Sequence, residues 1–287
     1  MMVMEREYEE MKISKANIVS CKDYYHEKMY SLTKQISELK NTPTLVVIQI
    51  DDDIASSSYI KGKKKDCEEV GINFKHFKLD SAKNSQKSLC NILTAFSNDK
   101  LVHGIILQLP IPQKYNLDEL LKCIDPGKDV DGFRKESKFV PCTPKGIVDW
   151  LEYNQYDFVG KDVTVLGRSK IVGKPLVDML IDKGATVTCC NSHTSHIERY
   201  TLNSNLVISA IGKAQLLCCE IPRDAIVIDV GISRDINGKL CGDVNYEYVN
   251  KYVNNTYVTP VPRGVGLLTR LTLLENVLKA YKIQEKV

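Results

Sequence analysis

Apolar residues along the chain recur with two different periods. Near the N-terminus they are spaced by three or four residues, at Tyr25, Met29, Leu32, Ile36 and Leu39. This spacing predicts an amphipathic helix. Apolar runs at Thr44–Ile50 and Gly104–Leu109 predict buried strands. Helical spacing starting near Ser57, and again around Leu89–Phe96, places helices between these strands and gives a βαβ-type unit.

The second half repeats the alternation of strands and helices. After a helix expected at Lys145–Tyr153, the apolar runs predict strands at Val163–Leu166, Ala185–Cys190, Leu206–Ile211 and Ala225–Val230. Alternation of this kind is typical of an α/β protein with mostly parallel sheets. We expect two domains, residues 1–159 and residues 160–266, with the boundary near Gly160.

Composition excludes several classes of protein. A chain of 287 residues is long enough for two domains of about 150 residues each. The net charge of +3 gives no general reason to expect nucleic acid or a membrane surface as a partner. No apolar run approaches the roughly 20 residues of a membrane span, and Met1–Lys12 is too charged for a secretory signal. We therefore expect a folded, cytoplasmic protein.

The cysteines and histidines do not predict a metal site. The chain has 10 cysteines, most of them within apolar segments, and none forms a Cys-x-x-Cys pair. The 5 histidines do not stand at metal-ligand spacing from them. Reduced, buried thiols are the simplest interpretation, and we expect no bound metal.

A glycine turn follows the first strand of the second half. Gly167 and Gly173 flank a loop that leads into a helix with Pro175 near its start, a geometry that suits a phosphate. The spacing is not Gly-x-Gly-x-x-Gly, and such turns are common in α/β proteins. The next strand ends without the acidic residue that NAD sites usually carry. Arg168 and Ser192 are candidates for the extra phosphate of NADP, and the alternative for Arg168 is a solvated loop charge.

One lysine falls on an apolar helix face. At about 100° per residue, Lys63 lies in the same arc as Tyr59, Ile60, Cys67 and Val70. The opposite arc carries Lys61, Lys64, Lys65, Glu68 and Glu69. Loss of hydration favours a neutral amine, so an inward-facing lysine is a usable proton carrier. The alternative is a lysine that extends to the edge of the sheet.

Further polar residues stand where a strand ends or a turn begins. Gln108 interrupts an apolar segment at the carboxyl end of a strand, where open α/β sheets place ligands. Asp129 and Asp131 flank a valine before a glycine turn. Turn formation alone explains Asp129 better than it explains Asp131.

These segments, in this order, resemble one family. They are Tyr59-x-x-x-Lys63, Gly104-Ile-Ile-Leu-Gln-Leu-Pro-Ile-Pro112, Lys128-Asp-Val-Asp-Gly-Phe133, Pro141-Cys-Thr-Pro-Lys-Gly-Ile147, Gly167-Arg-Ser-Lys-Ile-Val-Gly-Lys-Pro175, Ala225-Ile-Val-Ile-Asp-Val-Gly-Ile232, Gly242-Asp-Val244 and Thr259-Pro-Val-Pro262. Across about Thr44 to Ala280 the chain resembles the bifunctional methylenetetrahydrofolate dehydrogenase/methenyltetrahydrofolate cyclohydrolases.

The resemblance implies a fold and an activity. It implies a folate-binding α/β catalytic domain, a Rossmann-like NADP-binding domain, and a C-terminal helix (267–287) that returns to the first domain. It also implies substrate in the cleft between the domains, and a homodimer formed through the nucleotide domain. The implied reactions are NADP-dependent oxidation of 5,10-methylenetetrahydrofolate to the methenyl form and hydrolysis of that product to 10-formyltetrahydrofolate.

The resemblance also implies roles for residues. Lys63 is the implied catalytic lysine, Gln108 its hydrogen-bonding partner and Tyr59 an orienting aromatic residue. Tetrahydrofolate derivatives would contact Tyr59, Asp131, Pro262 and Gly264. NADP would contact Gly167, Arg168, Ser169, Gly173, Lys174, Pro175, Ser192, Gly212, Ile232 and Thr269.

The chain departs from the family pattern at one loop. Family members usually carry Pro-Gly-Gly-Val-Gly-Pro-Met-Thr, where this chain has Pro262-Arg-Gly-Val-Gly-Leu-Leu-Thr269. Arg263 in place of glycine either narrows the cleft or occupies a backbone angle that glycine adopts more easily. The loop before Tyr59 also lacks the usual glycine and proline. Three hypotheses remain: a bifunctional enzyme, a dehydrogenase with weak or absent cyclohydrolase activity, and a catalytically impaired folate- or nucleotide-binding protein.

Overall fold

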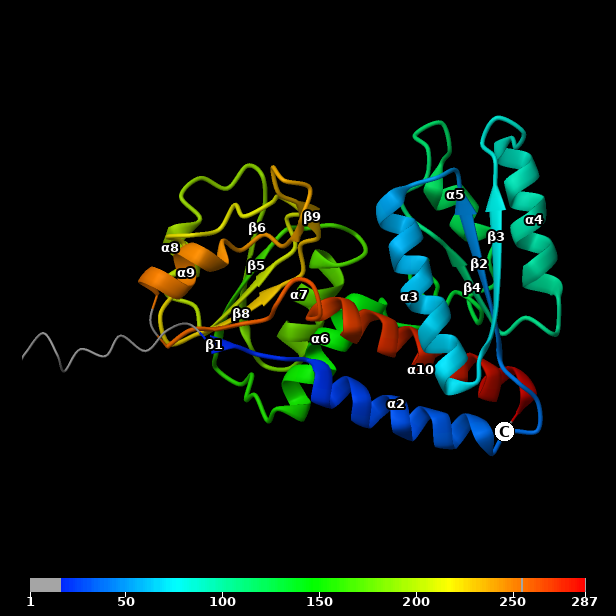
Figure 1. The fold of residues 1–287 in the computed structure, drawn as a ribbon, viewed down its shortest axis with the longest axis horizontal. Coiled ribbons are helices and arrows are strands. Elements are labelled where there is room, and N and C mark those ends of the chain that lie inside the picture. The colour runs from blue at the N-terminus through cyan, green and yellow to red at the C-terminus, as the bar shows by residue number, and fades with distance from the viewer. Residues whose placement is uncertain (1–16, 254, 287) are drawn as a thin grey trace, which may run out of the picture. The chain divides into compact units, whose positions relative to one another are not determined.

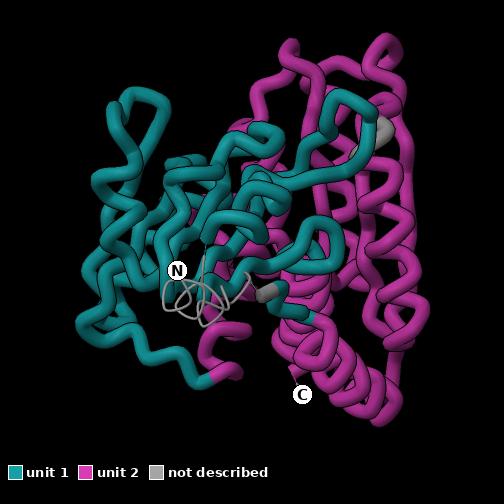
Figure 2. The backbone as a smooth tube through the Cα atoms, turned by 60° about the vertical axis from the view of Figure 1, so that its left-hand side comes forward, with its two compact units in different colours: residues 1–21, 155–266 teal, residues 22–154, 267–287 magenta. Residues whose placement is uncertain are grey.

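The computed structural model describes residues 17–253 and 255–286. The chain divides into two compact units (Figure 2). Unit 2 comprises residues 22–154 and 267–287, and unit 1 comprises residues 155–266 with the described part of 1–21. The segment Met1–Lys12, on which the expectation about export rests, lies outside the described residues.

Unit 2 contains a three-stranded parallel sheet. Its order is β3 (Asn73–Leu79), β2 (Thr44–Ile50), β4 (Gly104–Leu107). The central strand β2 is buried along its whole length, as its continuous apolar run predicts. The edge strand β3 has the polar sequence Asn-Phe-Lys-His-Phe-Lys-Leu and is largely exposed, which explains why the apolar pattern did not predict it.

Unit 2 also contains helices (Figure 1). They are α2 (Lys22–Ser37), α3 (Ile54–Val70), α4 (Gln86–Asn98), α5 (Leu117–Lys122), α6 (Cys142–Tyr153) and α10 (Val265–Glu285). From Leu267 onward α10 belongs to unit 2. It runs beside α2, where Nζ of Lys282 donates a hydrogen bond to Gln35, and the hydroxyl of Tyr281 accepts one from the backbone of Asn41. The expected return of the C-terminal helix is therefore present in the structure.

Unit 1 is built on a six-stranded parallel sheet. Its order is β1 (Asn17–Ile18), β11 (Tyr257–Val258), β8 (Ile226–Asp229), β7 (Leu206–Ser209), β5 (Asp162–Leu166), β6 (Thr186–Cys190). Its helices are α7 (Gly173–Asp182), α8 (Glu198–Thr201) and α9 (Tyr246–Tyr252). A short antiparallel pair, β9 (Ser233–Arg234) and β10 (Leu240–Cys241), completes the elements described for this unit.

The strands expected in the second half are all present: β5 begins one residue earlier than expected, and β6, β7 and β8 are shorter than expected. The described residues before Lys22 group with unit 1, because β1 pairs in parallel with β11. β1 contains only two residues, which is too short for an apolar pattern to be recognised in the sequence. Among the helices of the described residues, none combines the length and apolar character needed to cross a membrane.

Candidate active site

Lys63 lies on the buried face of α3. The helix begins after Asp53, whose Oδ1 accepts a hydrogen bond of 2.6 Å from the backbone of Ser56, and ends at Gly71 with a left-handed φ of 85°. Lys63 is only 4% exposed, and its helical neighbour Cys67 is fully buried. The side chain therefore points inward, as its place in the apolar arc predicts.

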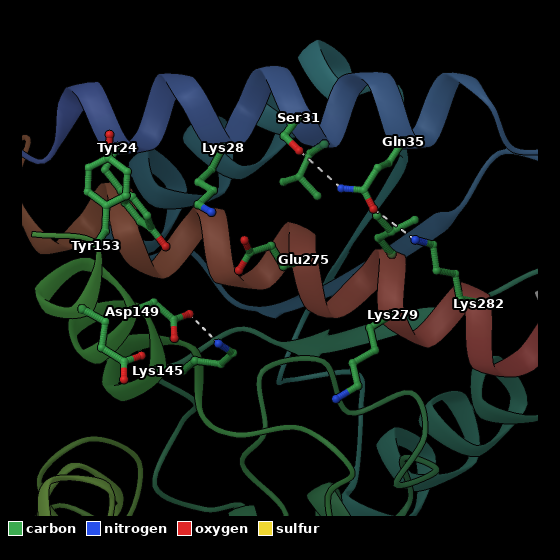
Figure 3. Close-up of a pocket in the computed structure, with 13 residues that line it drawn as sticks. Tyr24, Lys28, Ser31, Gln35, Lys145, Asp149, Tyr153, Glu275, Lys279 and Lys282 are labelled. Carbon is green, nitrogen blue, oxygen red and sulfur yellow. Dashed lines mark hydrogen bonds and ion pairs between the residues drawn. The ribbon is translucent and has the colours of Figure 1, made fainter. Parts of the chain in front are cut away.

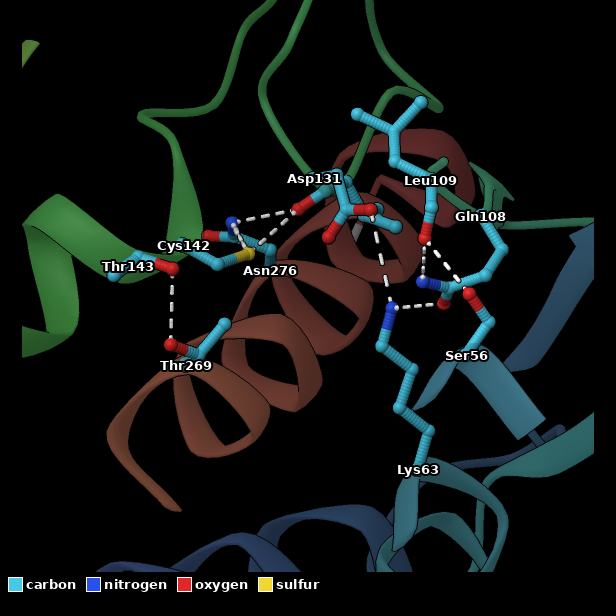
Figure 4. A network of polar contacts seen from close by, with 10 residues as sticks. Ser56, Lys63, Gln108, Leu109, Asp131, Cys142, Thr143, Thr269 and Asn276 are labelled. Carbon is cyan, nitrogen blue, oxygen red and sulfur yellow. Dashed lines mark hydrogen bonds and ion pairs between the residues drawn. The ribbon is translucent and has the colours of Figure 1, made fainter. Parts of the chain in front are cut away.

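Two polar groups and one aromatic ring lie near Nζ of Lys63, and Figure 4 shows the two polar ones, Gln108 and Asp131. Nζ donates a hydrogen bond of 3.1 Å to Oε1 of Gln108. Oδ2 of Asp131 lies 4.0 Å from the same nitrogen. The ring centroid of Tyr59, one turn earlier on α3, is 5.2 Å away. The structure thus brings together four residues that the sequence analysis had singled out from three separate segments.

The amide of Gln108 is held in one orientation. The backbone N–H of Gln108 donates to the carbonyl of Ile48, which extends the hydrogen bonding between β4 and β2 by one residue. The side-chain Nε2 donates a hydrogen bond of 2.8 Å to the carbonyl of Leu109. Ser56 donates to that carbonyl as well, at 3.1 Å. Because Nε2 is occupied, Oε1 is the atom that faces Lys63.

The two carboxylates around Val130 have different roles. Oδ2 of Asp129 accepts a hydrogen bond of 2.8 Å from the backbone of Arg134, so this side chain stabilises its own turn. Asp131 faces Lys63 instead. The carbonyl of Val130 accepts a hydrogen bond of 2.9 Å from Nδ2 of Asn276, which fixes the Asp131 segment to α10.

Tyr59 and Thr269 lie at the edge of this network. Burial raises the pKa of the Tyr59 phenol. The charge of Arg270 and a hydrogen bond with Thr269 lower this pKa, but by less. Thr269 also lies 3.0 Å from the hydroxyl of Thr143 on α6. Thr269, expected to contact the cofactor, thus belongs to unit 2 and joins the hydroxyl of Tyr59 to α6.

The candidate nucleotide loop in unit 1 is tightly closed. Gly167 follows β5 with φ of 115°, and a Cβ there would lie 2.5 Å from the carbonyl oxygen of Ala210. A Cβ at Gly173 would lie 2.0 Å from the carbonyl oxygen of Gly167. The hydroxyl of Ser169 accepts hydrogen bonds from the backbone of Val172 at 3.2 Å and of Gly173, the first residue of α7, at 3.4 Å. Only glycine fits at both loop positions.

Exposed donors stand at the carboxyl ends of β5 and β6. Arg168, Ser169, Lys174 and Ser192 are all exposed, and no Asp or Glu occurs within 167–175 or 189–194. Desolvation raises the pKa of the Cys189 thiol, and the charge of Arg168 partly lowers it again. The guanidinium of Arg168 therefore lies near the end of β6. This donor set fits a phosphate-bearing ligand.

The remaining cofactor candidates are spread over neighbouring loops. Gly212 has φ of 75°, and a Cβ there would meet no atom within 4 Å. Ile232 is 53% exposed. Pro175 lies in the first turn of α7, where backbone N–H groups have no partner within the helix, so the lack of an N–H on proline costs no hydrogen bond. The room beside Gly212 lets a ligand approach the backbone closely.

Two buried carboxylates in unit 1 support the Gly212 loop, and the sequence analysis did not single them out as site residues. Asp243 is fully buried and accepts hydrogen bonds from the hydroxyl of Ser209 at 2.7 Å and from the backbone of Ile211 and Lys213 at 2.8 and 2.9 Å. Asp229 accepts from the backbone of Asp243 at 2.9 Å. Desolvation raises the pKa of Asp229 to about 7. Asp229 has a signal in the sequence, because it is an aspartate that ends an apolar strand.

The departure from the family pattern has a backbone consequence. Arg263 adopts φ of 78°, in the left-handed region, and it is exposed, as is Pro262. Gly264 is buried, and a Cβ there would lie 2.3 Å from the carbonyl oxygen of Pro260. Arg263 therefore occupies a conformation that glycine adopts at lower cost.

A hollow in unit 2 contains none of the predicted site residues. It has a volume of about 740 Å³ and lies between α2, α6 and α10 (Figure 3). Lys145 forms an ion pair with Asp149, while Lys282 donates to the neutral amide of Gln35 and Lys28 lies over the ring of Tyr24. Both signs of charge line the hollow, so its charges indicate no particular ligand.

Comparison with known proteins identifies the family. The tetrahydrofolate dehydrogenase/cyclohydrolase catalytic domain matches residues 19–131, and the NAD(P)-binding domain of the same family matches residues 141–285. This chain belongs to the tetrahydrofolate dehydrogenase/cyclohydrolase family. The bifunctional protein FolD of Bacillus subtilis (strain 168) is 41% identical over 280 residues, which cover 93% of this chain and 98% of that protein.

Solved structures of the tetrahydrofolate dehydrogenase/cyclohydrolase family share the fold. The bifunctional FolD enzyme of Campylobacter jejuni superposes with a TM-score of 0.85 at 38% identity, covering 91% of this chain and 96% of that one. The Trypanosoma brucei enzyme, complexed with NADP cofactor and inhibitor, gives 0.88 at 28% identity, covering 96% and 100%. The expected family, two-domain α/β fold and bifunctional enzyme class are therefore confirmed, as is a nicotinamide nucleotide as cofactor.

Proposed function

We propose that this enzyme oxidises 5,10-methylenetetrahydrofolate with NADP and hydrolyses the methenyl product to 10-formyltetrahydrofolate, both at the site around Lys63. The observation that carries the proposal is the buried contact of Lys63 with Gln108 and Asp131 in unit 2. A buried amine with one fixed acceptor and one carboxylate within 4.0 Å is suited to moving protons.

In the hydrolytic step two protons move, and Lys63 takes the first. As the oxygen of water bonds to the bridge carbon, Lys63 accepts the proton that water loses. A second proton then passes from the new hydroxyl to N5 as the bond between carbon and N5 breaks, and one proton is released overall. Gln108 holds the amine in line through its Oε1, and the carboxylate of Asp131 stabilises the ammonium formed by proton uptake.

Asp131 and Tyr59 are proposed to orient the folate. A carboxylate accepts the adjacent N–H donors of a pterin ring together, which fixes its orientation as well as binding it. Tyr59 presents an aromatic ring beside Lys63. Pro262 and Gly264 remain proposed folate contacts.

For the oxidative step, NADP supplies the hydride acceptor when it is bound. The residues that would hold it are those of the glycine turn, Gly167, Ser169, Gly173 and Lys174, with Gly212, Ile232 and Thr269 as further contacts. Arg168 and Ser192 are proposed to bind the extra phosphate, supported by their exposure and by the lack of a nearby acid. A bound phosphate at these two residues would favour NADP over NAD.

The assembly and location are also proposals. Family resemblance supports a cytoplasmic homodimer joined through unit 1, with tetrahydrofolate derivatives as its substrates and neither nucleic acid nor membrane as a partner. The 10-formyl product would serve as a one-carbon donor, as in purine biosynthesis. Light scattering on a sizing column tests the dimer directly.

The reaction is tested by separating its two products. Purified protein is mixed with methylenetetrahydrofolate and NADP, and the absorbances of the reduced nicotinamide and of the methenyl compound are followed independently. Formation of reduced nicotinamide without accumulation of the methenyl compound supports both activities. Accumulation of the methenyl compound indicates a dehydrogenase alone, and no reaction indicates the impaired protein.

A further inference from the structure

An ion pair between a buried carboxylate and a partly buried guanidinium joins α3 and α10. Nε of Arg270 on α10 lies 2.7 Å from Oδ2 of Asp66 on α3, and their side chains are 21% and 4% exposed. The contact joins opposite charges: desolvation raises the pKa of the Asp66 carboxyl, and the positive charge of Arg270 partly lowers it again. The phenol of Tyr25 on α2 hydrogen-bonds the same carboxylate.

The sequence of α3 leaves room for this guanidinium. A Cβ on Gly62 would lie 2.3 Å from Nη1 of Arg270 and 3.2 Å from its Cζ. The guanidinium therefore lies directly against the α3 backbone, between Asp66 one turn later and Tyr59 nearly one turn earlier. A side chain at position 62 would displace it.

Both helices also carry one side of the catalytic network. Lys63 stands on α3, three residues before Asp66. Asn276 stands on α10, six residues after Arg270, and bonds the carbonyl of Val130 at 2.9 Å, immediately before Asp131. The separation of Lys63 from Asp131 thus depends on how α3 sits against α10.

We propose that Asp66 and Arg270 are positioning residues, which hold α3 against α10 so that Lys63 faces Asp131 at the 4.0 Å seen in the structure. This inference rests on the proposed function of Lys63. A buried ion pair is weak evidence for stability, because desolvation offsets its attraction. Placement of the reacting groups is the role that the geometry supports, since small displacements at a catalytic site reduce rates strongly.

The test removes both charges together. Asp66→Asn combined with Arg270→Gln leaves no unpaired buried charge, whereas either single change would leave one and endanger folding. The matched control is Lys64→Gln with Glu68→Gln, an ion pair of 3.7 Å on the exposed face of the same helix. Cyclohydrolase and dehydrogenase kcat, KM for NADP and thermal unfolding are measured for both variants and for the unaltered protein.

For the double variant we expect cyclohydrolase kcat to fall by about tenfold or more, which is within the loss of rate caused by small displacements of catalytic groups. KM for NADP should be unchanged. The control should match the unaltered protein. A lower unfolding temperature with unchanged kcat would overturn the inference and leave the pair a purely structural one. Gly62→Ala is a second variant that keeps both charges and displaces the guanidinium, and it should reduce the same kcat. Inactivity of the unaltered protein would refute the proposed function instead.

Discussion

Nζ of Lys63 donates a hydrogen bond of 3.1 Å to Oε1 of Gln108, while Nε2 of Gln108 donates to the carbonyl of Leu109 at 2.8 Å. The glutamine is therefore oriented by the backbone before it meets the lysine. This arrangement keeps an amine that is only 4% exposed at one place in the site.

Lys63→Met should separate the two activities. Methionine keeps the length of the side chain and removes its proton chemistry, so we expect cyclohydrolase turnover to fall by about a hundredfold or more, the scale of a lost general acid or base. Dehydrogenase activity should fall less, because that step depends chiefly on positioning. Hydrolysis of methenyltetrahydrofolate measures the effect, and Lys64→Met, on the exposed face of α3, is the control. Unchanged hydrolysis would remove Lys63 from the mechanism.

Arg168→Ala tests the choice of cofactor. Loss of one charge-assisted phosphate contact should weaken NADP binding by about 1.5–3 kcal/mol and leave NAD binding nearly unchanged. Titration calorimetry with each nucleotide gives the comparison. Arg223→Ala is a suitable control, because this exposed arginine precedes β8 and so lies at the opposite end of the sheet. An equal loss for both nucleotides would refute the proposed role.

Arg263→Gly tests the departure from the family pattern. Glycine relieves a left-handed φ of 78°, so stability should rise by about 1 kcal/mol, and ligand binding should weaken slightly or stay the same. Urea denaturation and steady-state kinetics measure the two effects. Asp224→Gly, at another left-handed position with φ of 53°, should show the gain in stability alone. A large gain in dehydrogenase turnover in Arg263→Gly would show that the arginine obstructs the site.

The pH dependence of stability should report Asp229. Its pKa rises from an ordinary value of 3.8 to about 7, so the folded protein binds this proton more tightly than the unfolded chain. The contribution of protonated Asp229 to the free energy of unfolding is therefore complete below about pH 4 and is lost as the pH rises through about 7. Asp229→Asn cannot ionise and lacks this dependence.

Urea denaturation of both proteins at about pH 5 and about pH 7.5 measures the difference. The stability of the unaltered protein, relative to Asp229→Asn, should be lower at the higher pH. Asp224→Asn, at an exposed position of the same unit, is the control. A relative stability that rises with pH would mean that the backbone N–H donors around Asp229 outweigh its desolvation.

Much of the fold follows from apolar spacing, since β2, β5 and β8 are mostly buried strands with predominantly apolar sequences. The same spacing placed Lys63 on the inward face of α3. Elements without such a run, such as β1 and β3, were not predictable, because pairing at a sheet edge needs little burial.

Tertiary partners explain what the sequence analysis missed at the site. Asp66 falls in the same arc of α3 as Tyr59, but its partner Arg270 is 204 residues away in the sequence, on α10. Periodicity within one helix carries no information about a counter-ion on another. The role of Asp243 was equally hidden, because it bonds backbone groups that only the folded loop presents.

The order in which the chain is synthesised has a consequence for the enzyme. Lys63, Gln108 and Asp131 are all made within the first half, yet Asn276 and Arg270, which secure their surroundings, belong to α10. A nascent chain therefore completes the unit 1 residues before it can close unit 2. Until α10 has emerged from the ribosome, Val130 and Asp66 lack their partners on that helix, and catalytic competence should appear late and abruptly during translation.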